Sequence, residues 1–270
     1  MILNNLIKAL LFNLGRPRHG QVKMTVGGEE ARFFARNYEQ LRYLKRFSDE
    51  EGINEARILR LLLEVLKPRD TVYDIGANIG THTVFIAKRI GPSGQVISFE
   101  PDSDIAQILE GHVRLNRLKN VTVFRLALGN REYEGDLFVD EKIGRGSTSL
   151  IATDGKTFSG RASVVRGDRI VAEKRLPVPR AVKIDVEGYE IEVLEGLERT
   201  LRHDECSYLC CEIHPALLPQ GRTQSDVFRI ARGLGFSPMG IYPRGREIHT
   251  LFGKSAGPGE HPSNSSSARG

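Results

Sequence analysis

Residues 54–252 of this 270-residue chain alternate between amphipathic stretches and short apolar runs. Stretches with apolar residues at helical spacing predict helices at Asn54–Leu66, Thr81–Ile90, Asp102–Leu118, Tyr189–Leu201 and Gln224–Leu234. Runs rich in β-branched and other apolar residues predict strands at Thr71–Ile75, Gln95–Phe99, Val121–Leu126, Ala181–Ile184, Ser207–Glu212, Phe236–Tyr242 and Ile248–Phe252. Repeated strand–helix units place parallel strands side by side with helices on both faces of the sheet. The pattern therefore predicts a doubly wound α/β fold with a mostly parallel seven-stranded sheet.

Three parts of the chain depart from this alternation and suggest the domain limits. Residues 1–50 form a helical and basic N-terminal segment, and residues 51–253 form the main domain. Within it, residues 133–168 are rich in Gly, Ser and Thr with short β-like pieces, which predicts an inserted hairpin with a flexible lid over the site. Residues 254–270 contain almost no apolar residues and predict a disordered tail.

The first residues of the chain can form an amphipathic helix, with Leu3, Leu6 and Leu10 on one face and Lys8 on another. A signal peptide is disfavoured, because Lys8 and Asn13 interrupt the apolar core and no small-residue cleavage site follows. Two interpretations stay open: peripheral membrane contact through residues 1–18, or packing on the body of the protein or on a second subunit in a homo-oligomer.

Charge and cysteine content narrow the partners and the compartment. The net charge is +5, of which +4 lies in residues 1–50 and only +1 in the rest, so a body that grips nucleic acid is not supported. Cys210 and Cys211 are adjacent in a predicted strand and therefore point to opposite faces, which leaves Cys206 as a poor disulfide partner. We expect a reducing, cytoplasmic compartment, and no run of about 18 apolar residues predicts a membrane span.

The turn after the first strand of the main domain carries the sharpest chemical signal. Val72–Thr81 reads VYDIGANIGT, in which Gly76 and Gly80 let a ligand approach the backbone before a helix begins. Asn78 stands where the dinucleotide fingerprint needs its second glycine, so a nicotinamide dehydrogenase is disfavoured. Asp74 favours a cationic ligand, and Glu100, at the end of the next strand, can accept both hydroxyls of a ribose. S-adenosylmethionine, with an ammonium, a sulfonium and no phosphate, fits this pair of acids.

From about Arg57 to Phe252 the sequence resembles the FkbM family of class I S-adenosylmethionine-dependent methyltransferases. The resemblance rests on VYDIGANIGTHTVFIAK at Val72–Lys88, VISFEP at Val96–Pro101, VKIDVEGYEIEVLEG at Val182–Gly196 and CEIHP at Cys211–Pro215. It implies a Rossmann-like fold and transfer of a methyl group to oxygen, commonly a hydroxyl of a sugar or natural product. The expected S-adenosylmethionine contacts are Asp74, Gly76, Ala77, Asn78, Gly80, Thr81, Glu100, Asp102 and Ala127.

Four polar residues after the fourth and fifth strands of the main sheet are the candidate catalytic groups. Asp185 and Glu187 follow Ala181–Ile184, while Glu212 and His214 end the next strand, so neighbouring strands would bring all four to one edge. His214 or Asp185 is the candidate base that takes the hydroxyl proton, and Glu187 and Glu212 can orient the acceptor or the base.

Structural alternatives exist for the same residues. Asp185 and Glu187 can stabilise the N-terminus of the helix that begins at Tyr189, and His214 can be a turn residue before Pro215. Lys183 can pair with a carboxylate. The cluster can also hold a divalent cation, although nothing in the spacing compels a metal, and we predict none.

The sequence thus predicts an O-methyltransferase acting on a hydroxyl of a small molecule, sugar or glycoconjugate. The alternative is a non-catalytic, or RNA- or protein-directed, S-adenosylmethionine-binding protein of the same fold. The stretch Arg145–Ser149 either covers the acceptor or is a flexible loop.

Overall fold

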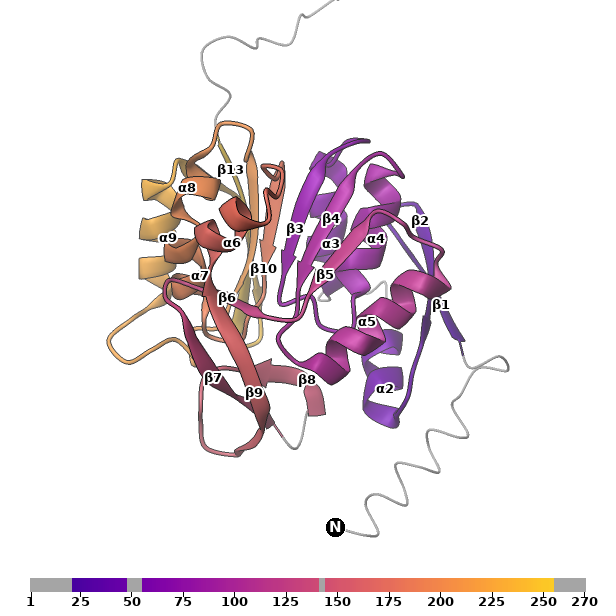
Figure 1. The fold of residues 1–270 in the computed structure, drawn as a ribbon, viewed down its shortest axis with the longest axis horizontal. Helices are drawn as coiled ribbons and strands as arrows, with labels where there is room; N and C mark the ends of the chain where they lie inside the picture. The colour runs from indigo at the N-terminus through magenta and orange to yellow at the C-terminus, as the bar shows by residue number, and fades with distance from the viewer. Residues whose placement is uncertain (1–20, 48–54, 141–143, 255–270) are drawn as a thin grey trace, which may run out of the picture.

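The computed structural model of the chain describes residues 21–47, 55–140 and 144–254 (Figure 1). The helix expected near residues 1–14 and nearly all of the expected tail lie outside these residues. No helix in the described part of the chain has the length and apolar character needed to cross a membrane.

A seven-stranded sheet forms the centre of the protein, in the order β12-β13-β11-β10-β3-β4-β5. Its strands are β3 (Thr71–Ile75), β4 (Gln95–Phe99), β5 (Val121–Phe124), β10 (Ala181–Ile184), β11 (Tyr208–Ile213), β12 (Phe236–Arg244) and β13 (Glu247–Lys254). Only β13 runs against its neighbours, so the expectation of a mostly parallel sheet is confirmed. The strands β4 and β5 lie on one side of β3, and β11, β13 and β12 lie on the other side of β10. The strand order therefore reverses between β3 and β10, which makes this place the topological switch point.

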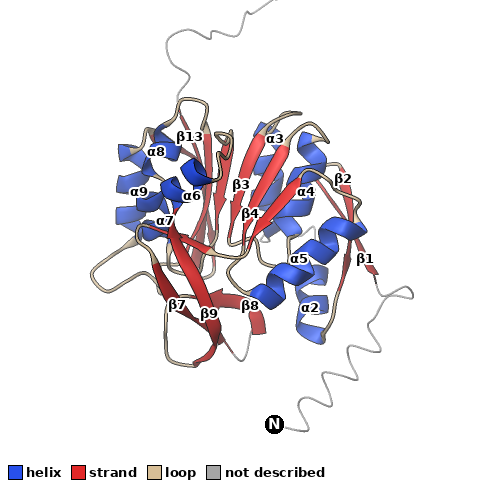
Figure 2. Cartoon of the chain, viewed as in Figure 1, coloured by secondary structure: helices blue, strands red, loops and turns tan. Residues whose placement is uncertain are grey.

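Helices cover both faces of this sheet (Figure 2). One face is packed by α3 (Glu55–Val65), α4 (Thr81–Ile90) and α5 (Ser103–Leu115), the other by α6 (Gly167–Glu173), α7 (Glu190–Gly196), α8 (Glu198–Arg202) and α9 (Gln224–Gly233). Side chains alternate between the two layers along each strand, as Cys210 and Cys211 do. All three cysteines are free and buried.

Residues 21–47 belong to the first of these layers, and their structure corrects the helical expectation for this segment. They form the antiparallel hairpin of β1 (Gln21–Val26) and β2 (Glu29–Phe34), followed by α2 (Tyr38–Phe47). Gly27 and Gly28 both have positive φ, as a two-residue hairpin turn requires, while Met24 and Phe33 are buried in the common core. The hairpin therefore buries an apolar face against α4 and α5 and is part of the main body.

The insertion over residues 133–168 contains the expected antiparallel pairing and contributes three strands to a second, four-stranded sheet. The strands β6 (Ala127–Gly129), β7 (Tyr133–Asp140), β8 (Gly144–Ser149) and β9 (Lys156–Arg166) pair in the order β6-β9-β7-β8. This sheet lies beside one end of the central sheet (Figure 1). Ser149 Oγ donates to the carbonyl of Glu187 at 2.8 Å, so that end is the one where the catalytic candidates lie.

The single helix expected over Tyr189–Leu201 is divided into α7 and α8. A Cβ on Gly196 would lie 1.9 Å from the carbonyl oxygen of Gly129, so close packing on β6 requires a glycine there. Asp168 accepts hydrogen bonds from the backbone N–H groups of Arg199 and Thr200, which satisfies the start of the second helix.

Candidate active site

The glycine loop Gly76–Gly80 joins β3 to α4 beside the topological switch point. Gly76 and Gly80 have φ of 72° and 86°, which only glycine adopts without strain. A Cβ on Gly76 would lie 1.8 Å from the carbonyl oxygen of Asp185, so this loop and the end of β10 are in direct contact. The N–H groups of Gly76 and Ala77 both donate to the carbonyl of Phe99, at 3.0 and 3.1 Å, which holds the loop against β4.

Glu100, directly after β4, is joined to this loop through its carboxylate. Its Oε2 accepts from the backbone N–H of Asn78 at 2.8 Å and its Oε1 from that of Asp102 at 2.9 Å. Burial raises the pKa of Glu100 to about 7, although both hydrogen bonds oppose that rise. Asp102 caps α5 by accepting from the N–H groups of Asp104 and Ile105.

The remaining expected cofactor residues lie around the same loop. Thr81 begins α4, and its Oγ1 is 3.0 Å from the hydroxyl of Tyr43 in α2. Ala127 is buried at the start of β6. Nδ1 of His112 in α5 donates to the carbonyl of Ile79 at 2.7 Å, and its Nε2 accepts from the N–H of Phe34 at 3.1 Å, so His112 connects the loop to the N-terminal hairpin.

Beneath the loop lies a buried polar layer centred on Lys183. Its Nζ donates to the carbonyl of Gly76 at 2.8 Å and lies 3.2 Å from Asp74 Oδ1 and 3.5 Å from Asp185 Oδ2. Burial alone would lower the pKa of Lys183, but the two carboxylates outweigh it and raise that pKa. The expected pairing of Lys183 with a carboxylate is confirmed. Asp74 differs from the sequence expectation, because it is fully buried and its cationic partner is Lys183.

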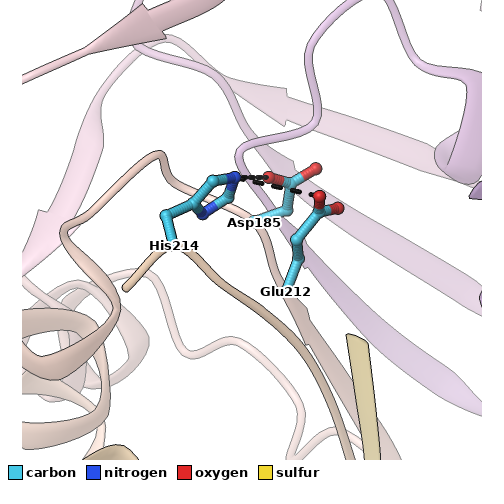
Figure 3. A group of neighbouring side chains, drawn as sticks. All are labelled: Asp185, Glu212 and His214. Atoms are coloured by element: carbon cyan, nitrogen blue, oxygen red, sulfur yellow. Dashed lines mark ion pairs between the residues drawn. The ribbon is translucent and has the colours of Figure 1, made fainter. Parts of the chain in front are cut away.

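The four catalytic candidates converge at the carboxyl ends of β10 and β11. His214 Nε2 lies 3.8 Å from Glu212 Oε1, 3.9 Å from Glu187 Oε2 and 4.0 Å from Asp185 Oδ1. Figure 3 shows the imidazole facing the carboxylates of Asp185 and Glu212. Parallel pairing of Ile184 with Cys211 sets this register, because it brings the residues after both strands to the same edge.

Glu190 is a member of the cluster that the sequence analysis missed. It is completely buried, and its Oε1 accepts from the N–H of Gly188 at 2.9 Å and lies 2.7 Å from His214 Nδ1. The only signal in the sequence was that Glu190 is an acidic residue in the first turn of a predicted helix. Tyr189 is the N-cap of α7, and its side chain makes no capping hydrogen bond.

The surrounding carboxylates set the protonation of the cluster. Burial would lower the pKa of His214, but the hydrogen bond to Glu190 and the charges of Glu187, Glu190 and Asp185 raise it to about 9. Burial raises the pKa of Glu187 to about 7. Burial would raise the pKa of Asp185 as well, but Lys183 and His214 outweigh it and lower that pKa. The imidazole therefore carries a proton at neutral pH, whereas Glu187 titrates near that pH.

Two further residues come from the closing strands and were not anticipated. Arg244 Nη1 of β12 lies 3.2 Å from Glu212 Oε1, and His249 Nε2 of β13 lies 2.9 Å from Glu212 Oε2. Burial lowers the pKa of His249 to about 4, so this imidazole is neutral, and its buried Nε2 makes no hydrogen bond with any residue that the structure describes. Both residues lie far from the motifs in sequence. The antiparallel pairing of β13 with β11 places His249 beside Glu212, and the pairing of β12 with β13 brings Arg244 to the same end.

A glycine loop at the switch point, an acid at the end of the next strand and a polar cluster beside both define a class I methyltransferase. The sequence matches the family described as the methyltransferase FkbM domain over residues 74–238. It is also 32% identical to the hexuronic acid methyltransferase AglP of Haloferax volcanii, an alignment that covers 74% of this chain and 77% of that protein. The chain belongs to the FkbM methyltransferase family and is an S-adenosylmethionine-dependent methyltransferase.

Solved structures with similar folds have low sequence identity to this chain. Methyltransferase FkbM from Methylobacillus flagellatus KT is 17% identical with a TM-score of 0.48, and the match covers 72% of this chain but only 46% of that one. A SAM-dependent methyltransferase from Aquifex aeolicus is 14% identical with a TM-score of 0.43, and the match covers 74% and 93% of the two chains.

Proposed function

We propose that this enzyme transfers the methyl group of S-adenosylmethionine to a hydroxyl of a sugar or sugar-containing acceptor. The position of Lys183 carries the proposal: one ammonium group contacts the glycine loop at Gly76 O and the catalytic cluster at Asp185. A methyl donor on that loop and an acceptor on that cluster would therefore be neighbours.

The donor would lie across the ends of β3 and β4. Each oxygen of Glu100 already accepts one backbone N–H, and an ionised carboxylate has about four acceptor positions, so both oxygens can still accept from ribose hydroxyls. Gly76 and Asn78 would lie against the amino-acid end of S-adenosylmethionine and hold it in place. Asp74 would contribute indirectly, because it pairs with Lys183, which in turn binds the carbonyl of Gly76. Asp102 and Ala127 would bound the adenosine.

The cluster would supply positioning and a proton acceptor. Methyl transfer is an in-line displacement at carbon, in which the acceptor oxygen forms a bond to the methyl group as the carbon–sulfur bond breaks. Because His214 is protonated at neutral pH, we assign the base to Glu187, whose pKa of about 7 is close to the working pH. His214 and Glu212 then orient the acceptor hydroxyl, with Asp185 beside the methyl donor.

The acceptor class follows from the relative. AglP is a methyltransferase of a hexuronic acid, and this chain aligns with 77% of it, so a sugar hydroxyl is the leading acceptor. The insertion supports a bound acceptor, because Ser149 of β8 contacts the Glu187 backbone and closes one side of the cluster. A polysaccharide or glycolipid acceptor, rather than nucleic acid, is consistent with the near-neutral charge of residues 51–270.

Calorimetry with S-adenosylhomocysteine and with NAD tests the donor. We expect S-adenosylhomocysteine to bind and NAD not to bind. Glu100→Ala should weaken S-adenosylhomocysteine binding at least tenfold with an unchanged circular dichroism spectrum, because the ribose loses its acceptor. Binding of NAD alone would refute the donor assignment, and unchanged affinity in Glu100→Ala would remove its ribose role.

Transfer of a labelled methyl group to a panel of uronic acids and neutral sugars tests the acceptor. Donor binding without transfer to any hydroxyl compound would favour the alternative, a non-catalytic or RNA- or protein-directed protein of the same fold.

A further inference from the structure

The imidazole of His214 is in an unusual environment for a buried polar group. Its side chain is only 4% exposed, and Nδ1 is bonded to Glu190. Nε2 points into the group of carboxylates, yet it makes no hydrogen bond with any of them in the described part of the chain, because their oxygens lie 3.8–4.0 Å away. A ring that is buried as a whole but whose Nε2 faces three carboxylates without bonding to them leaves room for a ligand between them.

We propose that Asp185, Glu212 and His214 bind a divalent cation of the Mg²⁺ or Mn²⁺ class, which takes the place of the proton on His214 Nε2. Their ligand atoms all lie within 4.8 Å of one another. Two neighbouring ligand atoms that each lie about 2.1 Å from an octahedral cation are ~3 Å apart, so the carboxylate oxygens at 3.8 and 4.0 Å from His214 Nε2 would move inward by about 1 Å around the ion.

Each ligand is also held from behind, as ligands of metal sites usually are. Glu190 orients the His214 ring through Nδ1 at 2.7 Å, which leaves Nε2 to face the site. His249 Nε2 lies 2.9 Å from Oε2 of Glu212, and Lys183 Nζ lies 3.5 Å from Oδ2 of Asp185. The oxygens that face His214 Nε2 are Oδ1 of Asp185 and Oε1 of Glu212, and the latter also pairs with Arg244 Nη1 at 3.2 Å, a contact that the cation would replace.

The local charge favours a cation. The cluster and the layer beneath it contain two permanently cationic side chains, Lys183 and Arg244. Lys183 faces the carboxylates of Asp74 and Asp185, and Arg244 faces that of Glu212, while Glu187 and Glu190 lie beside His214. Asp185 and Glu212 supply the oxygen ligands that Mg²⁺ and Mn²⁺ prefer, His214 adds a nitrogen, and three protein ligands leave coordination positions for water or the acceptor hydroxyl.

The role of the ion rests on the proposed function, whereas its binding does not. A cation at this place would bind the acceptor oxygen and lower the pKa of the hydroxyl, and Glu187, outside the three ligands, would remain the base.

The test is Mn²⁺ binding to the chelator-treated full-length chain, followed by the electron paramagnetic resonance signal of free Mn²⁺. We expect one Mn²⁺ per chain, displaced by Mg²⁺. Asp185→Asn and His214→Gln should each weaken binding at least tenfold. Glu110→Gln is the matched control, because Glu110 of α5 pairs with Arg125 outside the site. This variant should bind Mn²⁺ as the wild type does.

Three results would overturn the proposal. The first is a wild type that binds no Mn²⁺. The second is Mn²⁺ binding as tight in both ligand variants as in the wild type. The third is a loss of binding in His249→Gln alone, which would place the ion at Glu212, Glu247 and His249 instead. Asp185 is partly exposed, so its variant remains informative if His214→Gln does not fold. S-adenosylhomocysteine titrations of the same samples separate the two proposals: donor binding without Mn²⁺ refutes only the cation, and Mn²⁺ binding without the donor refutes only the donor site.

Discussion

Replacing Lys183 with methionine would remove the one cation that joins the glycine loop to the catalytic cluster. The Lys183 side chain is 5% exposed and that of Asp74 is completely buried, so water cannot screen the carboxylate that the change leaves behind. Removing one partner of a buried ion pair costs about 3–5 kcal/mol. The hydrogen bond to Gly76 O adds about 1 kcal/mol. We therefore expect Lys183→Met to lower the free energy of unfolding by about 4–6 kcal/mol.

The assay is urea unfolding of both proteins at several pH values. Lys183 lowers the pKa of Asp185 below its ordinary value of 3.8, and a lowered carboxylate pKa stabilises the folded state above that value and less as the pH falls through the folded-state pKa. The variant lacks most of this contribution, so its deficit should be complete at pH 7 and should shrink below about pH 4.

Two further variants control this experiment. Lys183→Met combined with Asp74→Asn should recover at least half of the lost stability, since the stranded charge is gone. Lys119→Met removes an exposed lysine and should change stability by less than about 0.5 kcal/mol. A loss below about 1 kcal/mol in Lys183→Met, or an equal loss in the Lys119 variant, would refute the reasoning.

Three other predictions concern the loop and the cluster. Gly76→Ala should abolish S-adenosylhomocysteine binding in calorimetry while the circular dichroism stays native-like, because its Cβ would lie 1.8 Å from the Asp185 carbonyl oxygen; unchanged affinity would show that the loop has room. In the wild type, kcat/KM should rise as the pH increases through about 7, where Glu187 loses its proton, and Glu187→Gln should remove this rise; its persistence would exclude Glu187 as the base. His112→Phe should lower the free energy of unfolding by about 2–4 kcal/mol in urea, because it leaves the buried Ile79 carbonyl and Phe34 N–H without partners, and a loss under about 0.5 kcal/mol would show that these bonds do not hold the hairpin.

The sequence by itself determined the strand and helix pattern of the main domain, its mostly parallel sheet and the position of the glycine loop. These features depend on local physics: apolar periodicity follows the nearest helix or strand, and Gly76 and Gly80 mark positive φ. It also placed Asp185, Glu187, Glu212 and His214 at one edge, because residues after neighbouring parallel strands meet there.

The tertiary structure alone decided how these groups are paired. Cross-strand register brings Lys183 opposite Asp74, so the acid expected to face a ligand lies in a buried ion pair. The start of α7 places Glu190 behind His214, which changes the imidazole from a candidate base into a protonated group, and β13 supplies His249 to Glu212. Such contacts join residues far apart in the chain, and their charges act through space in a buried environment, so no pattern along the sequence contains them.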